Sequence, residues 1–207
     1  MENANHDDSH DEIDFSSTFG SSEIGLEPKT SLIVPNNVLK NIERIKGIRS
    51  IMFATTTVTL YTPIARRQLR RDFNIACAKM YVYGLNKTYK AEIVASLASL
   101  EFAIELLEMD VALWQGQSNP LTPCVFEMLL VSPQSVRMMR ALQRLDKCML
   151  GVYSAYLSDL ITKAEKSAVL RPFHIAYINF KRVAMKLDMN ESAKEIVETM
   201  EREVNFT

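Results

Sequence analysis

The segment that most constrains the fold is residues 50–62, SIMFATTTVTLYT. It is rich in β-branched and aromatic residues and contains no glycine, proline or charge, which predicts a β-strand. A lone strand is not stable, because its backbone donors and acceptors need a partner. No second segment of comparable quality stands out in the chain. We therefore expect the same strand of another copy to pair with it, as an antiparallel ribbon about a two-fold axis.

The predicted strand has two different faces, because successive side chains point to opposite sides. One face is mainly apolar and carries Ala54, Thr56, Val58 and Leu60. The other carries hydroxyl groups, from Thr55, Thr57, Thr59 and Tyr61. A two-stranded ribbon fits the major groove of DNA, where hydroxyls can hydrogen-bond to base edges and threonine methyls can contact thymine. The pattern therefore predicts a homodimer that binds double-stranded DNA.

The distribution of charge agrees with an anionic partner. The whole chain has a formal net charge of −1, but residues 1–39 hold one lysine against eight acidic residues. Residues 40–90 hold eleven Lys and Arg against two acidic residues, a net charge of +9. A basic block of this size inside a nearly neutral chain is typical of a surface that binds a polyanion. The alternative is a solvated basic face with no partner.

Two helices are expected directly after the strand. Thr62-Pro63 predicts a helix start and Gly84 its end. A second helix is expected from about residues 86–88, and a third from Ser132-Pro133, the same type of start, to about residue 164. Two more are expected over residues 172–187 and after Asn190, and no internal repeat is expected.

The first of these helices begins with like charges at i,i+4 spacing, Arg66 with Arg70 and Arg67 with Arg71. Each such pair costs about 0.2–0.5 kcal/mol, and a nearby phosphate backbone would turn the repulsion into attraction. The next helix offers backbone N–H groups at its start for a phosphate oxygen. The predicted DNA-binding residues are Thr55, Thr57, Thr59, Tyr61, Arg49, Arg66, Arg67, Arg70, Arg71, Lys87, Thr88 and Lys90.

Residues 50–112 resemble the ribbon-helix-helix repressors of the Arc and methionine-repressor type. The resemblance rests on the run TVTLYTP, the helix and glycine turn that follow, and NKTYKAEI. It implies that Thr57, Thr59 and Tyr61 contact bases and that Lys87 and Thr88 bind phosphate. It also implies the fold class: mainly α with one β-strand per chain, a ribbon-helix-helix homodimer with a C-terminal helical extension. The first helix is about two turns longer than is usual in that family.

The whole chain is also similar to the AcaB-like regulators of large conjugative plasmids. The similarity lies in the segments IKGIRSIMF, LYTPIARRQL, EMDVALWQ and ALQRLDKCMLGVYSAYL. It implies a transcriptional activator of conjugative transfer genes, whose C-terminal helices could contact the transcription machinery. The alternative function is a non-enzymatic structural or adaptor protein of a conjugation or partition apparatus.

Other functions are not expected from the sequence. The motifs GxxxxGK[ST], GxGxxG, HExxH and GxSxG are absent, so the chain is predicted not to be an enzyme and to need no cofactor or metal. We expect His174 to be structural, the acidic residues of 101–110 to form a solvated face, and His6 and His10 to bind no metal. The cysteines, outside metal-ligand spacing, and the lack of a secretion signal or an 18-residue apolar run predict a cytoplasmic protein that does not enter membranes.

The predicted domains are three. Residues 1–30 are expected to be a disordered acidic tail, and residues 31–118 a ribbon-helix-helix region for DNA binding and dimerisation. Residues 119–207 are expected to form a C-terminal helical region.

Overall fold

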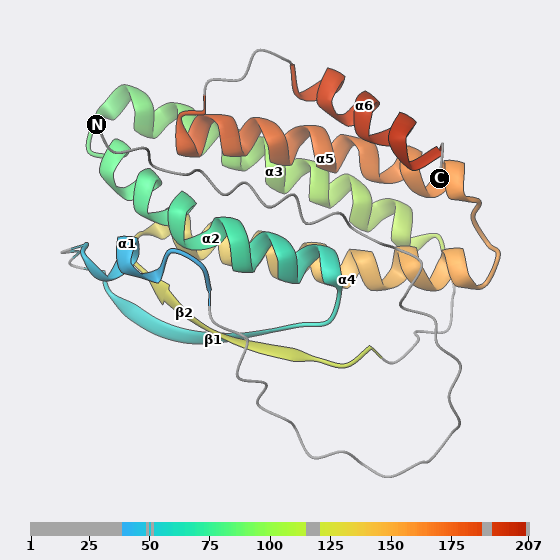
Figure 1. Cartoon of the computed structure of the whole chain (residues 1–207), viewed down its shortest axis with the longest axis horizontal. Helices are drawn as coiled ribbons and strands as arrows, with labels where there is room; N and C mark the ends of the chain where they lie inside the picture. The colour runs from blue at the N-terminus through green and yellow to red at the C-terminus, as the bar shows by residue number, and fades with distance from the viewer. Residues whose placement is uncertain (1–38, 49, 51, 115–120, 188–191, 206–207) are drawn as a thin grey trace, which may run out of the picture. The chain divides into compact units, whose positions relative to one another are not determined.

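The computed structural model describes residues 39–48, 50, 52–114, 121–187 and 192–205 (Figure 1). Contacts divide the chain into two units, residues 1–32 and 33–207, and every described residue belongs to the second. The predicted acidic tail, His6, His10 and Arg49 lie outside the described residues. The elements are α1 (Ile42–Lys46), β1 (Ala54–Leu60), α2 (Pro63–Tyr83), α3 (Lys87–Ala112), β2 (Cys124–Leu130), α4 (Pro133–Leu157), α5 (Lys163–Met185) and α6 (Ala193–Asn205).

The predicted strand finds its partner in its own chain. β1 pairs antiparallel with β2, in a register that runs from Ala54 opposite Leu130 to Leu60 opposite Cys124. The prediction of one strand per chain and of a ribbon shared across a homodimer is therefore wrong. β2 has the sequence CVFEMLL, in which glutamate, methionine and two leucines favour helix more than strand. Because its local propensity favours helix, this strand was not predicted from the sequence. Pairing with β1 stabilises it as a strand.

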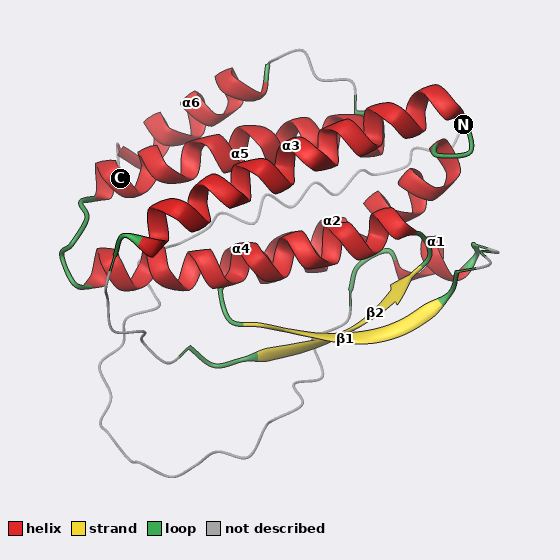
Figure 2. Cartoon of the chain, turned by 180° about the vertical axis from the view of Figure 1, so that it is seen from behind, coloured by secondary structure: helices red, strands yellow, loops and turns green. Residues whose placement is uncertain are grey.

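The ribbon formed by β1 and β2 lies along α2 and α4, and α3 and α5 lie beyond these two helices (Figures 1 and 2). α6 packs against α5. The inner face of the ribbon is apolar and buried, and it carries Val58, Leu60, Phe126, Met128 and Leu130. Burying one side of an alternating strand fixes its register, because a slip by one residue would exchange the two faces. The other side of the ribbon is consequently held outward.

A strand–helix–helix unit occurs twice in the described part of the chain, as β1-α2-α3 and as β2-α4-α5. In both units two residues separate the strand from a proline at the start of a long helix, Pro63 or Pro133. No internal repeat was expected from the sequence, and the structure shows a repeated order of elements. The two starts are stabilised differently, since Ser132 forms a capping box with Ser135 whereas Thr62 makes no side-chain cap. The repeat is therefore one of architecture with little shared sequence.

The boundary between α4 and α5 differs from the expected one. α4 ends at Leu157, and α5 begins at Lys163 with Pro172 inside it rather than at its start. Thr162 and Glu165 form a capping box, which supplies acceptors for the N–H groups of the first turn and so begins the helix earlier than expected. Pro172 cannot donate a helical hydrogen bond, yet α5 continues through it to Met185.

The acidic side chains of α3 also differ from expectation. Glu101 and Glu108 accept paired hydrogen bonds from Arg137 and Arg144 of α4, at 2.5–2.9 Å. The hydrogen bond from Arg144 holds the pKa of Glu108 below its usual value. Bidentate pairs of this kind fix orientation as well as contributing energy. They therefore lock α3 to α4 instead of forming a freely solvated face.

Candidate nucleic-acid interface

The outward face of the ribbon is the surface that the sequence analysis predicted from β1. Thr55, Thr57 and Thr59 are exposed, and Tyr61 just beyond the strand is 38% exposed. The residues between them on β1 include the buried Val58 and Leu60. The predicted alternation holds from Thr55 to Leu60, whereas Ala54, expected on the inner side, is exposed. Three threonines therefore lie in one row on the outward surface.

β2 contributes a second row to this face, which was not predicted from the sequence. Leu129 lies opposite Thr55, Glu127 opposite Thr57, and Val125 opposite Thr59. Glu127 is exposed and Val125 is 49% exposed. The alternation of Phe126, Met128 and Leu130 with these positions was the available signal in the sequence. The outward face of the ribbon therefore consists of one hydroxyl row and one row with an acidic residue at its centre.

Arg66 holds one end of the ribbon together. Its guanidinium donates to the carbonyl oxygens of Leu60 at 3.2 Å and Tyr61 at 2.6 Å, and also to that of Thr122 just before β2. The three carbonyls belong to the two chain segments that border the ribbon there. The Arg66 side chain thus binds backbone carbonyls at the end of the ribbon. This structural role accounts for an arginine at position 66 without the predicted contact with DNA.

The side chain of Asp146 on α4 binds the junction between β1 and α2. Its carboxylate accepts hydrogen bonds from the backbone N–H of Tyr61 at 2.8 Å and of Thr62 at 2.7 Å. It also accepts one from the Thr62 hydroxyl at 2.7 Å, and its side chain is buried. An acceptor from the other strand–helix–helix unit therefore fixes the backbone just before α2 and binds the Thr62 hydroxyl, which makes no cap hydrogen bond to that helix.

The remaining arginines of α2 differ in how they are engaged. Arg67 and Arg70 are exposed and have no ion-pair partner among the described residues. Arg71 pairs with the buried Asp72 at 3.0 Å, and Asp72 also binds Lys181 and the Tyr177 hydroxyl. Burial raises the pKa of Asp72, but Arg71 and Lys181 outweigh it and hold the pKa below its usual value. Arg67 and Arg70 are thus the two arginines of this group best placed to meet an outside anion.

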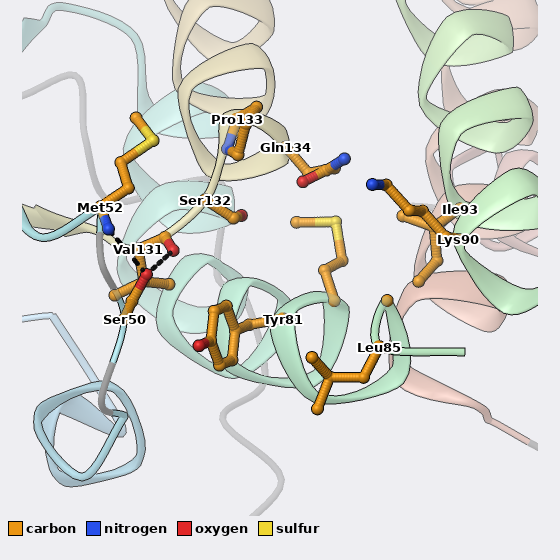
Figure 3. A pocket seen from close by; sticks show the side chains of 12 residues that line it. Ser50, Met52, Tyr81, Leu85, Lys90, Ile93, Val131, Ser132, Pro133 and Gln134 are labelled. Atoms are coloured by element: carbon orange, nitrogen blue, oxygen red, sulfur yellow. Dashed lines mark hydrogen bonds between the residues drawn. The ribbon is translucent and has the colours of Figure 1, made fainter. Parts of the chain in front are cut away.

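The start of α3 is also exposed, at Lys87, Thr88 and Lys90. The Asn86 side chain already accepts from the N–H groups of Thr88 and Tyr89. Lys90 lines a hollow that extends to Ser132 and Gln134 at the β2–α4 junction, and Lys90 and Gln134 point toward one another across it (Figure 3). On the other side of the hollow the Ser50 hydroxyl donates to the Val131 carbonyl at 2.7 Å. Lys90 therefore lies near an end of the ribbon, whereas the N–H groups predicted for phosphate are in part occupied.

Other kinds of site find no support among the residues that the structure describes. These residues contain no group of three metal-ligating side chains, and no helix among them is long and apolar enough to cross a membrane. His174 is half-buried beside Phe173, and burial lowers its pKa. Of the predicted site residues, the structure places Thr55, Thr57, Thr59 and Tyr61 on or beside the outward face of the ribbon.

Comparisons with known proteins give one structural likeness. No protein-family model matches the chain, and no curated protein matches it in sequence. The fold is similar to the crystal structure of selenomethionine-containing AcaB from uropathogenic E. coli, with a TM-score of 0.55 and 11% sequence identity. The likeness covers 74% of this chain and 87% of that chain. An AcaB-like fold is thereby shown, in agreement with the second resemblance found in the sequence.

Proposed function

We propose that the chain is a non-enzymatic transcriptional regulator that binds duplex DNA by placing its ribbon in the major groove. The observation that carries the proposal is the outward hydroxyl face of Thr55, Thr57 and Thr59 on a ribbon whose inner face is buried. The major groove is about 12 Å wide, which admits two paired strands, and it presents a distinct pattern of donors and acceptors for each base pair. A hydroxyl group can donate to an acceptor or accept from a donor on a base edge.

The contacts divide into those that recognise bases and those that position the protein. Thr57 and Thr59 contact base edges, because they lie in the middle of the exposed row of β1. Arg67 and Arg70 bind phosphate oxygens beside the groove. Arg66 and Arg71 act indirectly, since the first closes the ribbon and the second pairs with Asp72.

The internal pairing of the ribbon sets the form of the DNA site. A single chain supplies both strands, so one chain is sufficient for one site. The two strands differ, with three threonines facing Leu129, Glu127 and Val125, so the preferred site is not a palindrome. This distinguishes the proposal from a two-fold ribbon, which favours palindromic sites.

The resemblance to AcaB-like regulators supports a finer proposal about the target. We infer that the regulated genes are conjugative transfer genes and that the protein activates them from the cytoplasm. A promoter–reporter fusion in cells with and without the protein tests the sign of regulation. Higher reporter expression with the protein present supports activation. Lower expression would mean that the protein is a repressor.

The first prediction concerns the two central threonines. The double variant Thr57→Ala, Thr59→Ala should weaken binding to a duplex selected by the natural protein from a random pool. Two lost hydrogen bonds to bases correspond to about 1–3 kcal/mol, which is roughly 5- to 150-fold in affinity. Binding to unrelated duplex should change little, because phosphate contacts supply it. A gel-shift titration with both duplexes at fixed salt measures the two affinities.

A matched control is Thr199→Ala, because Thr199 is exposed on α6 and far along the chain from the ribbon. It should bind both duplexes as the natural protein does. If the double variant lost the same factor on both duplexes, the threonines would not recognise bases. A natural protein that selected no duplex at all would contradict the proposed function itself.

The second prediction concerns Glu127, the acidic residue at the centre of the proposed interface. A carboxylate there repels phosphate but can accept a hydrogen bond from the amino group of cytosine. Glu127→Gln should therefore raise affinity for unrelated duplex by roughly two- to fivefold. It should also relax the preference for a cytosine at one position of the selected site. Repeating the selection with the variant tests this, and an unchanged preference together with unchanged affinity would place Glu127 outside the interface.

A further inference from the structure

The outer side of α3 carries a continuous apolar stripe. It consists of residues spaced by four, three, four, four, three and four, namely Ala91, Ala95, Ala98, Phe102, Leu106, Met109 and Leu113. With 3.6 residues per turn, all seven fall within about 40° of the direction of Phe102. All are exposed, and the exposed fractions of the large ones are 58% for Phe102, 38% for Leu106, 64% for Met109 and 79% for Leu113.

The opposite side of α3 is already used by the protein's own core. The buried residues of the helix are Ile93, Leu97, Leu100, Ala103, Ile104 and Leu107. A surface helix normally has one apolar and one polar side, whereas a helix that is apolar all round is buried on both. The outer stripe is therefore a surface that the described part of the chain leaves without a cover.

We propose that the stripe of α3 binds the same stripe of a second copy, with the two helices antiparallel about a two-fold axis at Phe102. In this register the small residues of one copy face the large residues of the other. Ala98 faces Leu106, Ala95 faces Met109, and Ala91 faces Leu113. Each of these large side chains thus meets an alanine, which is the alternation of sizes that lets two helices approach closely.

The charges near the stripe allow this pairing. The seven residues of the stripe are uncharged, and Ser99 and Glu105 lie at its two borders. Glu92 and Asp110 lie about 80° from Phe102 and flank the stripe. Glu101 and Glu108, farther round the helix, pair with Arg137 and Arg144 of the same chain. No like charges have to meet at the centre of the interface.

The area is sufficient for a weak to moderate dimer. If a large apolar side chain offers roughly 150–200 Å², the four large residues expose on the order of 400 Å² per copy. Two copies with their alanines then bury on the order of 1,000 Å², the area that a specific interface should exceed. A patch of several hundred Å² on one chain is itself typical of an interaction surface.

The proposed dimer leaves the ribbon free. α3 lies on the far side of α2 and α4 from the ribbon in both views (Figures 1 and 2). The two ribbons of the dimer would therefore remain exposed, each complete within its own chain. This dimer differs from the strand-sharing dimer expected from the sequence, and it does not depend on DNA binding.

Sedimentation of the full chain over a concentration series tests the inference. The natural protein should pass from the monomer mass of 23.5 kDa to twice that mass as its concentration rises. Met109→Lys should raise the dissociation constant of the dimer at least tenfold, because the new charge faces Ala95 of the second copy. Val82→Lys is the matched control, since Val82 is 54% exposed on α2, outside the stripe, and should leave the dimer unchanged.

A charge pair tests the register. Ala95→Glu alone should also dissociate the dimer, and Ala95→Glu combined with Met109→Lys should restore it, since each new glutamate then faces a new lysine. Thermal unfolding monitored by circular dichroism verifies that each variant is folded. A natural protein that stays monomeric, a dimer that survives Met109→Lys, or a double variant without rescue would overturn the proposal. A dimer that forms only after removal of residues 1–38 would assign the stripe to that segment instead.

Discussion

Replacing Asp146 with alanine is expected to lower the free energy of unfolding by about 2–4 kcal/mol, because the variant leaves buried donors without an acceptor. The carboxylate accepts three hydrogen bonds, two from the backbone of Tyr61 and Thr62 and one from the Thr62 hydroxyl. A methyl group accepts none of them. Chemical denaturation monitored by circular dichroism measures the change, and the midpoint should fall with little change in slope.

Two further variants separate this anchor from a general effect of losing an acidic residue. Asp146→Asn keeps one acceptor oxygen for Thr62 but presents a donor to the Tyr61 N–H. Its free energy of unfolding should therefore lie between those of the natural protein and of Asp146→Ala. Glu92→Ala, at an exposed position of α3, should stay within about 0.5 kcal/mol of the natural protein. An Asp146→Ala variant as stable as the Glu92 control would mean that the β1–α2 junction is held by other contacts.

Reversing the charge of two arginines is expected to have the largest effect on DNA binding. The double variant Arg67→Glu, Arg70→Glu should lose at least about 100-fold in affinity on selected and unrelated duplex alike, since each charge-assisted hydrogen bond to phosphate contributes about 1.5–3 kcal/mol. The log–log dependence of affinity on salt should become less steep by about two units, because each phosphate contact contributes about 0.9. Gel-shift titrations at several salt concentrations measure both quantities.

The control for this variant is Lys194→Glu. Lys194 is exposed on α6, which is distant from both strands of the ribbon in the sequence. It should leave the salt dependence unchanged. Equal slopes for the natural protein and the double variant would remove Arg67 and Arg70 from the interface. Loss on the selected duplex alone would instead assign them to bases.

The sequence was sufficient to predict β1, its two faces and the helices that follow it. Four threonines and one valine among seven residues favour a strand, and the alternation around Val58 decides which side is buried. Thr62-Pro63 and Gly84 mark the ends of α2 for local reasons, through the proline at the helix start and the turn at its end. Such features depend on a few neighbouring residues, which is why they can be predicted from a single sequence.

The partner of β1 could not be found in the same way. β2 is separated from β1 by α2, α3 and the segment after α3, and its composition favours helix, so only tertiary pairing makes it a strand. The same limit applies to Arg66, whose acceptors lie on both sides of the ribbon, and to Asp146, which binds a junction 84 residues earlier in the chain. A residue that acts across such a distance leaves no periodic signal in sequence.

The central claim is that a ribbon made by one chain enters the major groove with its threonine face forward. A photo-crosslinking amino acid placed at position 57 tests it most directly, on a duplex selected by the natural protein and with position 199 as the control. The account predicts crosslinks to bases from position 57, lost when a major-groove ligand occupies the duplex and retained with a minor-groove ligand. Crosslinks no stronger than those from position 199, or crosslinks that only a minor-groove ligand removes, would contradict it.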